Sequence, residues 1–95
     1  MSAYVFVNIE VTDPVQYEEY KKLALATVIA HGGRYIARGG RAESLEGSWR
    51  PHRVVLLEFP SAQQAKTWWD SEAYRPVKAM RHASARTEMM LVEGV

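Results

Sequence analysis

AYVFVNIEVTDPVQYEEYKKLALATVIAHGG, residues 3–33, joins a strand-like run directly to a helix-like run. Residues 3–11 are rich in β-branched and aromatic side chains, which is typical of a strand. Successive side chains of a strand point to opposite faces. The odd-numbered positions from Val5 to Val11 are aliphatic, whereas the even-numbered face starts with Tyr4 and Phe6 and then turns polar. This alternation predicts one core face and a second face that is apolar over half its length.

The run that follows has the start and stop signals of a helix. Asp13 or Thr12 can cap the free amides, and Pro14 suits the first turn. Gly32 and Gly33 supply the left-handed residue at which helices commonly end. At helical spacing, one stripe faces the core: Tyr17, Tyr20, Ala24, Val28 and His31.

The rest of the chain repeats these signals. Strand-like runs occupy residues 34–40 (RYIARGG), 52–59 (HRVVLLEF) and 86–95 (RTEMMLVEGV). Between the last two, residues 60–71 predict a helix capped by Ser61, and residues 71–83 predict a further helical segment. The order is therefore β-α-β-β-α-β.

That order predicts an α+β, ferredoxin-like domain over residues 1–95, with a four-stranded antiparallel sheet and the helices on one face. The other face would be bare in a monomer, and its predicted side chains are apolar: Tyr4, Phe6, Val54, Leu56, Met90 and Val92. A patch of this kind usually marks an interface. We therefore expect a homodimer in which two sheets face each other as a dimeric α+β barrel.

Composition excludes several classes of protein. With 12 basic and 11 acidic residues, the charge is too balanced and scattered for a nucleic-acid-binding protein. No apolar run is long enough for a membrane span, and the N-terminus lacks the pattern of a signal peptide. There is no cysteine, and the three histidines are far apart, so we expect a cytoplasmic protein without a metal site or other cofactor.

The segment GGRAESLEGSWRP, residues 39–51, separates two strands and contains Trp49. Glycine permits positive φ and close backbone approach, so this is a shaped loop. Trp49 would either cover a ligand at the end of the sheet or pack against its own protomer or a partner.

Three charged residues lie in or beside apolar strands, where a charge needs a partner. Arg38 and Arg53 could hold a carboxylate by a two-point contact. Glu58 could act as a general base with a raised pKa, or pair with an arginine of the adjacent strand. Tyr20 could direct its hydroxyl into a cavity between helix and sheet, or simply be a core residue with a hydrogen-bonded tip. The alternative for the charges is structural ion pairs.

The pattern VTDPxxYxxYxxLA…AHGGRYxxRGG…LEGxWRPxRVVxxEFPSxxxAxxWxxSxxY, from Val11 to Tyr74, resembles the domain-of-unknown-function family numbered 1330. The resemblance implies the dimeric α+β barrel fold and no particular reaction. Cofactor-free monooxygenases of that superfamily use an asparagine on strand 1, a tryptophan on helix 2 and a histidine further on. Asn8, Trp68 (or Trp69) and His82 are superficially similar.

Three functions remain open from the sequence. The first is binding of a small, partly apolar anion in a cleft between the sheet, the first helix and the Trp49 loop, with Tyr20, Arg38, Trp49, Arg53 and Glu58 as ligand-binding residues. The second is a cofactor-independent enzyme, monooxygenase-like or isomerase-like, that uses the same cleft, with Glu58 or Asn8 as catalytic residues. The third is an interaction module whose polar residues serve only the dimer.

Overall fold

Seven elements follow one another in the predicted order. The computed structural model describes residues 1–95 and contains β1 (Ala3–Val11), α1 (Pro14–Ala30), β2 (Arg34–Arg38), β3 (Arg53–Phe59), α2 (Ala62–Trp69), α3 (Arg75–Ser84) and β4 (Ala85–Glu93). The predicted further helical segment is thus α3, separated from α2 by a short turn.

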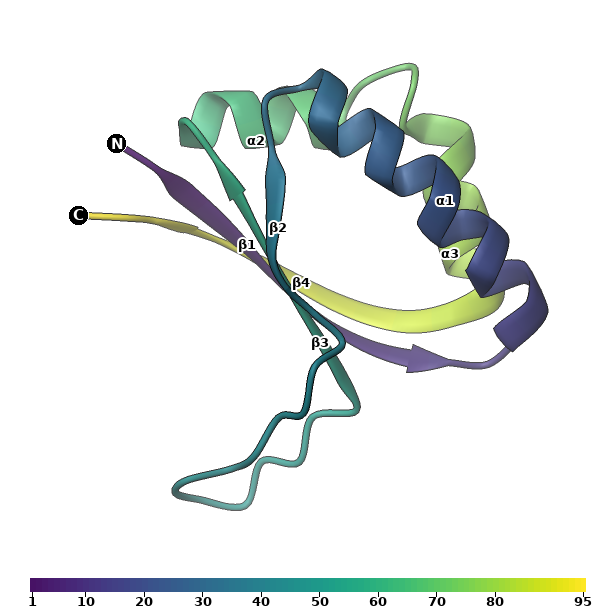
Figure 1. Cartoon of the computed structure of the whole chain (residues 1–95), viewed down its shortest axis with the longest axis vertical. Helices are drawn as coiled ribbons and strands as arrows, with labels where there is room; N and C mark the ends of the chain where they lie inside the picture. Colours follow the sequence, from purple (N-terminus) through teal and green to yellow (C-terminus); the bar gives the residue numbers. More distant parts are fainter.

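The strands form one antiparallel sheet in the order β2-β3-β1-β4. β1 is central, and its Val5 lies opposite Leu57 of β3 and Leu91 of β4. Because β1 and β4 are adjacent and antiparallel, the two termini lie close together, and Gly94 N donates a hydrogen bond to Ser2 O (2.7 Å). All three helices cover the same face of the sheet (Figure 1). This is the predicted ferredoxin-like α+β fold.

The predicted caps are confirmed for the first two helices. The Asp13 side chain accepts a hydrogen bond from Gln16 N, and Ser61 accepts one from Gln64 N. Gly32 follows α1 with φ of +79°, the left-handed conformation that glycine adopts at no steric cost. None of the helices combines the length and apolar character needed to cross a membrane.

The core lies between the sheet and the helices. Phe59, Trp68 and Tyr74 are almost completely buried, with ring centroids 5.3 Å apart for Phe59–Trp68 and 4.3 Å for Trp68–Tyr74. Trp68 also donates a hydrogen bond to Thr27 Oγ1 (3.1 Å), which joins α2 to α1. The aromatic cluster therefore holds the helix layer together above the sheet.

The opposite face of the sheet, here called the open face, carries the apolar side chains that the alternation predicts: Tyr4, Phe6, Val54, Leu56, Met90 and Val92. Met90 is 63% exposed and Val92 48% exposed. No helix covers this face (Figure 1). The β2–β3 arm, residues 39–52, lies on this side of the sheet (Figure 1).

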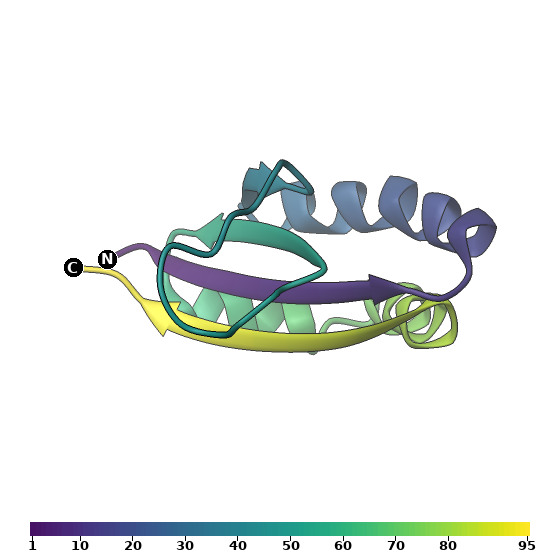
Figure 2. The ribbon, with the colours of Figure 1, turned by 90° about the horizontal axis from the view of Figure 1, so that it is seen from below.

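The β2–β3 arm starts at the end of β2 and projects away from the sheet on the side opposite the helices (Figure 1), so that it overlaps the strands when seen from below (Figure 2). Its two left-handed residues are Gly39 (φ +71°) and Gly47 (φ +88°). Trp49 reaches the open face and contacts Phe6, with 5.5 Å between ring centroids. The arm thus lies on the open-face side, where residues 40–50 are exposed.

Candidate functional site

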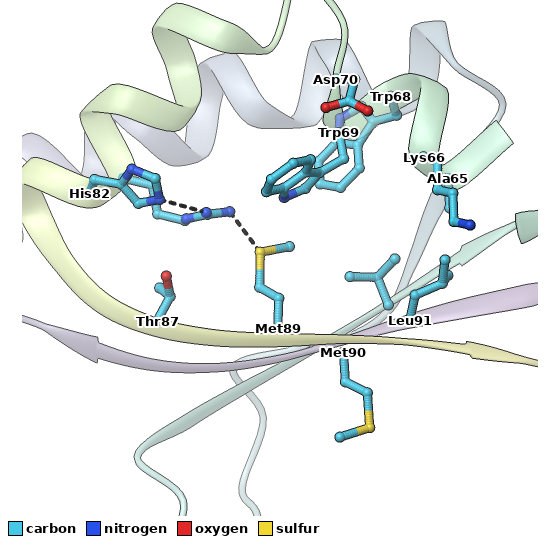
Figure 3. A pocket seen from close by; sticks show the side chains of 12 residues that line it. Ala65, Lys66, Trp68, Trp69, Asp70, His82, Thr87, Met89, Met90 and Leu91 are labelled. Atoms are coloured by element: carbon cyan, nitrogen blue, oxygen red, sulfur yellow. Dashed lines mark hydrogen bonds between the residues drawn. The ribbon is translucent and has the colours of Figure 1, made fainter. Parts of the chain in front are cut away.

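The largest recess on the helical side, here called the β4 pocket, lies between α2, α3 and the edge strand β4. It has a volume of about 410 Å³. Trp69 and Asp70 lie on one side of the space, Thr87, Met89 and Leu91 rise from the strand opposite, and Met90 points away (Figure 3). The remaining lining residues are Val5, Ala65, Lys66, Trp68, Arg81 and His82. The pocket is thus mostly apolar, with polar side chains from α3, from α2 and its C-cap, and from β4.

Arg81 is the most unusual residue of this pocket, because it is only 3% exposed and takes part in none of the four ion pairs. Its Nη1 donates to Tyr74 Oη (2.8 Å) and to Met89 Sδ (2.9 Å). Its Nε is buried without an acceptor. A buried guanidinium without a carboxylate retains capacity for an anionic partner.

His82 lies beside Arg81, with 3.1 Å between its Nε2 and Arg81 Nη2. Since a guanidinium can only donate, Nε2 is the acceptor and the ring proton sits on Nδ1. Desolvation lowers the pKa of His82, and the positive charges of Arg81 and Lys78 lower it further. His82 is therefore neutral at pH 7. Lys78, in turn, lies over the Trp69 ring, 3.4 Å from its centroid.

Tyr74 connects Arg81 to helix α1. Its hydroxyl accepts from Arg81 and lies 2.8 Å from the hydroxyl of Tyr20. Burial strongly raises the pKa of Tyr74, so it stays protonated. Tyr20, predicted as a ligand residue or a core residue with a hydrogen-bonded tip, is 9% exposed and has that hydrogen bond.

A second, smaller cavity lies under α1 and is here called the α1 cavity. Its volume is about 30 Å³. Tyr20, Arg38 and Arg53, three of the five predicted ligand-binding residues, line it together. Arg81, Met89 and Trp68 line both this cavity and the β4 pocket, so they form the wall between the two.

Trp49 and Asn8 lie on the other side of the sheet. They line a shallow hollow of about 590 Å³ on the open face, together with Phe6, Glu88, Met89, Met90 and Val92. The Asn8 side-chain oxygen accepts a hydrogen bond from His52 N (3.0 Å), which fixes the end of the arm to β1. Asn8 is thus held by a backbone contact.

Glu58 forms an ion pair with an arginine of the adjacent strand, which was one of its two predicted roles. Arg34 Nε of β2 lies 2.6 Å from Glu58 Oε1. This hydrogen bond, more than any other interaction, lowers the pKa of Glu58. The expectation of a raised pKa, as a general base requires, is therefore wrong for this structure.

The expected single cleft between the open face, the first helix and the Trp49 loop does not form. α1 covers one face of the sheet and the β2–β3 arm projects from the other (Figures 1 and 2). Tyr20, Arg38 and Arg53 are consequently separated from Trp49 by the sheet. For the same reason Asn8 does not meet Trp68 and His82, which line the β4 pocket.

Sequence reasoning missed Arg81, Trp69 and Met89 as a group. A signal for Arg81 was present, because Tyr74, Val77, Arg81 and Ser84 follow one another at helical spacing and all four are buried. An arginine on a core-facing stripe is uncommon enough to mark a site. Nothing in the sequence indicates that β4 faces α2 across an open space.

Comparison with solved structures supports the ferredoxin-like fold. A protein of unknown function from Rhodopseudomonas palustris, RPA0582, aligns with TM-score 0.80 and 15% identity over 99% of this chain and 82% of its own. SnoaB, a cofactor-independent oxygenase from Streptomyces nogalater, aligns with TM-score 0.69 and 10% identity over 99% and 93%. A dimeric ferredoxin-like protein of unknown function from Jannaschia sp. CCS1 aligns with TM-score 0.67 and 14% identity over 99% and 100%.

The comparison with curated proteins finds no match. The family described as Domain of unknown function (DUF1330) matches residues 2–95, nearly the whole chain, in agreement with the resemblance seen in the sequence. This protein therefore belongs to the DUF1330 family.

Proposed function

We propose that this protein binds a small, partly apolar carboxylate in the β4 pocket. The observation that carries the proposal is Arg81, a buried guanidinium that no acidic side chain neutralises. A carboxylate entering the pocket would supply the missing negative charge. The predicted anionic ligand is thus retained, with Arg81 as its anchor, and the predicted residues Tyr20, Arg38 and Arg53 belong to the neighbouring α1 cavity.

The dimensions and walls of the pocket support an organic ligand. A volume of about 410 Å³ lies within the usual range for small-molecule sites. Trp69, Met89 and Leu91 offer an apolar surface to a ring or alkyl chain. Neutral His82 adds no charge, and the one carboxylate of the lining, the exposed Asp70, is accompanied by the cationic Lys66. A partly apolar carboxylate combines both requirements.

The test is calorimetric titration with benzoate and with its neutral counterpart benzamide. We expect benzoate to bind, benzamide to bind at least tenfold more weakly, and Arg81→Met to weaken benzoate by about 10- to 100-fold, the usual value of a charge-assisted hydrogen bond. Arg86→Met, at an exposed position of β4, is the matched control. Trp69→Ala, at the partly exposed rim, tests the pocket without changing a buried charge. Equal affinity of both probes, or of wild type and the Trp69 variant, would contradict the proposal.

We also propose that the protein works as a cytoplasmic homodimer whose two open faces cover each other. Met90, Val92 and Trp49 are each about half or more exposed, which is costly for a monomer. The dimeric neighbour from Jannaschia supports this arrangement by its fold. In the dimer, Trp49 and Asn8 would belong to the interface, and the Arg34–Glu58 pair would remain at the edge of the sheet.

A second candidate function is cofactor-independent oxygenation in the same pocket. The fold that the chain shares with SnoaB favours it. Arg81 would stabilise a substrate enolate that reacts with O₂, and an anthrone CH₂ would become C=O with release of H₂O. His82 and Trp68 line the pocket, whereas Asn8 and Glu58 lie outside it. Incubation with dithranol, followed by absorbance and O₂ uptake, would contradict this candidate if the rate does not exceed the uncatalysed one.

A further inference from the structure

We infer that the α1 cavity is a second binding site, separate from the β4 pocket, that takes a small oxyanion of the size of a carboxylate group. The inference goes beyond the proposed function, because it concerns a different cavity on the other side of Arg81. It would hold even if the β4 pocket had another ligand.

The first observation is charge. The α1 cavity is lined by four cationic side chains and no acidic one: Lys21, Arg38, Arg53 and Arg81. Lys21 pairs with Glu18, 2.8 Å away. None of the three arginines forms an ion pair with a carboxylate. Three guanidinium groups around one small space leave a strong positive potential inside it.

The second observation is the position of Arg53. Its Nε is buried and has no hydrogen-bond acceptor, and its guanidinium carbon lies 5.8 Å from the ring centroid of Tyr17. Gly39 packs directly against the guanidinium, so that any added Cβ would collide with it. The left-handed φ of +71° also favours glycine there. The chain therefore holds Arg53 against the cavity from two sides.

The third observation is the chain of hydrogen bonds that ends at Tyr20. Arg81 can only donate, so Tyr74 Oη accepts from it. Tyr20 Oη lies 2.8 Å from Tyr74 Oη, and either hydroxyl can donate this bond, because a hydroxyl oxygen accepts up to two. Whichever hydroxyl donates to the other, one O–H of the pair stays free, and Tyr20 lines the cavity. Tyr20 thus brings a hydroxyl to the cavity wall that is linked to Arg81 through Tyr74.

The fourth observation is size and access. About 30 Å³ accommodates roughly two water-sized atoms, which corresponds to the two oxygens of a carboxylate. Arg38 is exposed and Lys21 half-buried, so the cavity reaches solvent beside them. Burial raises the pKa of Tyr35 to about 12 and also raises the pKa of Tyr17, so these neighbouring phenols stay neutral and do not supply the missing negative charge.

The test is titration with sodium formate, followed by the ¹H–¹⁵N signals of the arginine Nε–H groups. Formate is exchanged stepwise for sodium pivalate, so that the total carboxylate concentration and the ionic strength stay constant. The tertiary butyl group of pivalate is too large to enter the α1 cavity. We expect the Arg53 Nε–H signal to move saturably with formate and not with pivalate. The same result with both anions, or no movement with either, would overturn the inference.

Variants separate this site from the β4 pocket. Tyr20→Phe removes the hydroxyl from the cavity wall, together with its hydrogen bond to Tyr74, and should weaken formate binding by about tenfold. Gly39→Ala should weaken it by displacing Arg53. Gly40→Ala is the matched control, because a Cβ there meets nothing. Unchanged affinity in both Tyr20→Phe and Gly39→Ala would overturn the inference, whereas benzoate binding in the β4 pocket should be unaffected by Gly39→Ala. If formate does not bind but benzoate binding still depends on Arg81, only this inference is wrong. If formate binds as expected but benzoate does not, the proposed function is wrong and this inference stands.

Discussion

At the residue scale, the buried Arg81 requires a physical explanation. Removing a charge from water is costly unless hydrogen bonds and polarisable neighbours replace the hydration. Arg81 finds Tyr74 Oη, Met89 Sδ and the ring of His82, and its guanidinium carbon lies 5.9 Å from the Tyr74 ring centroid. These contacts make the charge tolerable without neutralising it. Arg81 is therefore suited to anion binding.

This arrangement predicts that Tyr74→Phe destabilises the protein by about 2 kcal/mol, because a hydrogen bond to a charged group is lost while the ring remains to pack on Trp68. Urea denaturation at fixed protein concentration is the measurement. Tyr4→Phe, half-buried on the open face, is the control and should differ little from wild type. A Tyr74→Phe midpoint equal to wild type would show that Tyr74 Oη contributes nothing to holding Arg81.

At the element scale, the edge strand β2 depends on β3. It has no other strand neighbour, and its pairing is interrupted between Tyr35 and Ala37. Arg34 and Glu58 are direct partners in the register and form the ion pair that joins the strands at one end. At the other end, Gly39 N donates to Val54 O (2.9 Å). The ion pair thus helps to hold a strand with few other restraints.

The lowered pKa of Glu58 predicts a pH dependence. Because the folded pKa lies below the ordinary value of 4.5, the pair stabilises the protein above pH 4.5, and this contribution is lost as the pH falls through the folded pKa. Glu58→Gln should therefore lower stability slightly at pH 7 and reduce the loss between pH 5 and pH 3. Thermal unfolding across this range measures it, with Glu88→Gln, an exposed glutamate outside any ion pair, as control. Parallel curves for wild type and Glu58→Gln would contradict the prediction.

At the scale of the whole molecule, the chain is a plate rather than a sphere. Its extents are 36 × 35 × 17 Å, and the shortest runs across the four strands, because Figure 1, seen down that axis, shows the sheet edge-on beside the helix layer. It exposes 6185 Å², against about 5,500 Å² expected for a folded monomer of 10.8 kDa. The projecting β2–β3 arm and the uncovered apolar sheet face both add to the exposed area. A second copy on the open face would give two sheets packed face to face between two helix layers.

The proposed dimer predicts that Met90→Glu, in the open face, shifts the protein towards monomer, because a carboxylate would be buried without a partner. Sedimentation equilibrium should then give a mass near 10.8 kDa for the variant and about twice that for wild type. Ile29→Glu is the control, since Ile29 is 61% exposed on α1, away from the open face. A monomeric wild type at micromolar concentration would refute the dimer.

The sequence by itself determined the order of the elements, their caps and the two faces of each strand. These are local properties. Alternation along residues 3–11 places Val5 and Phe6 on opposite faces of the sheet, and Asp13 and Ser61 each accept a hydrogen bond from the backbone amide three residues later. Of the five ligand-binding residues proposed from the sequence, Tyr20, Arg38 and Arg53 line one cavity, whereas the expected cleft with the Trp49 loop does not form. The two faces of a strand or helix follow from its own residues, so they are the same whichever elements pack against it.

The tertiary structure alone decided which side chains share a space. The β2–β3 arm is irregular, so no periodicity predicts that Trp49 crosses to Phe6 instead of covering the helical side. The β4 pocket is lined by residues of α2, α3, β1 and β4, which only the packing of the chain brings together. Arg81 becomes a buried cation without an acid only when residues from separate elements surround it, and its surroundings are therefore a property of long-range packing.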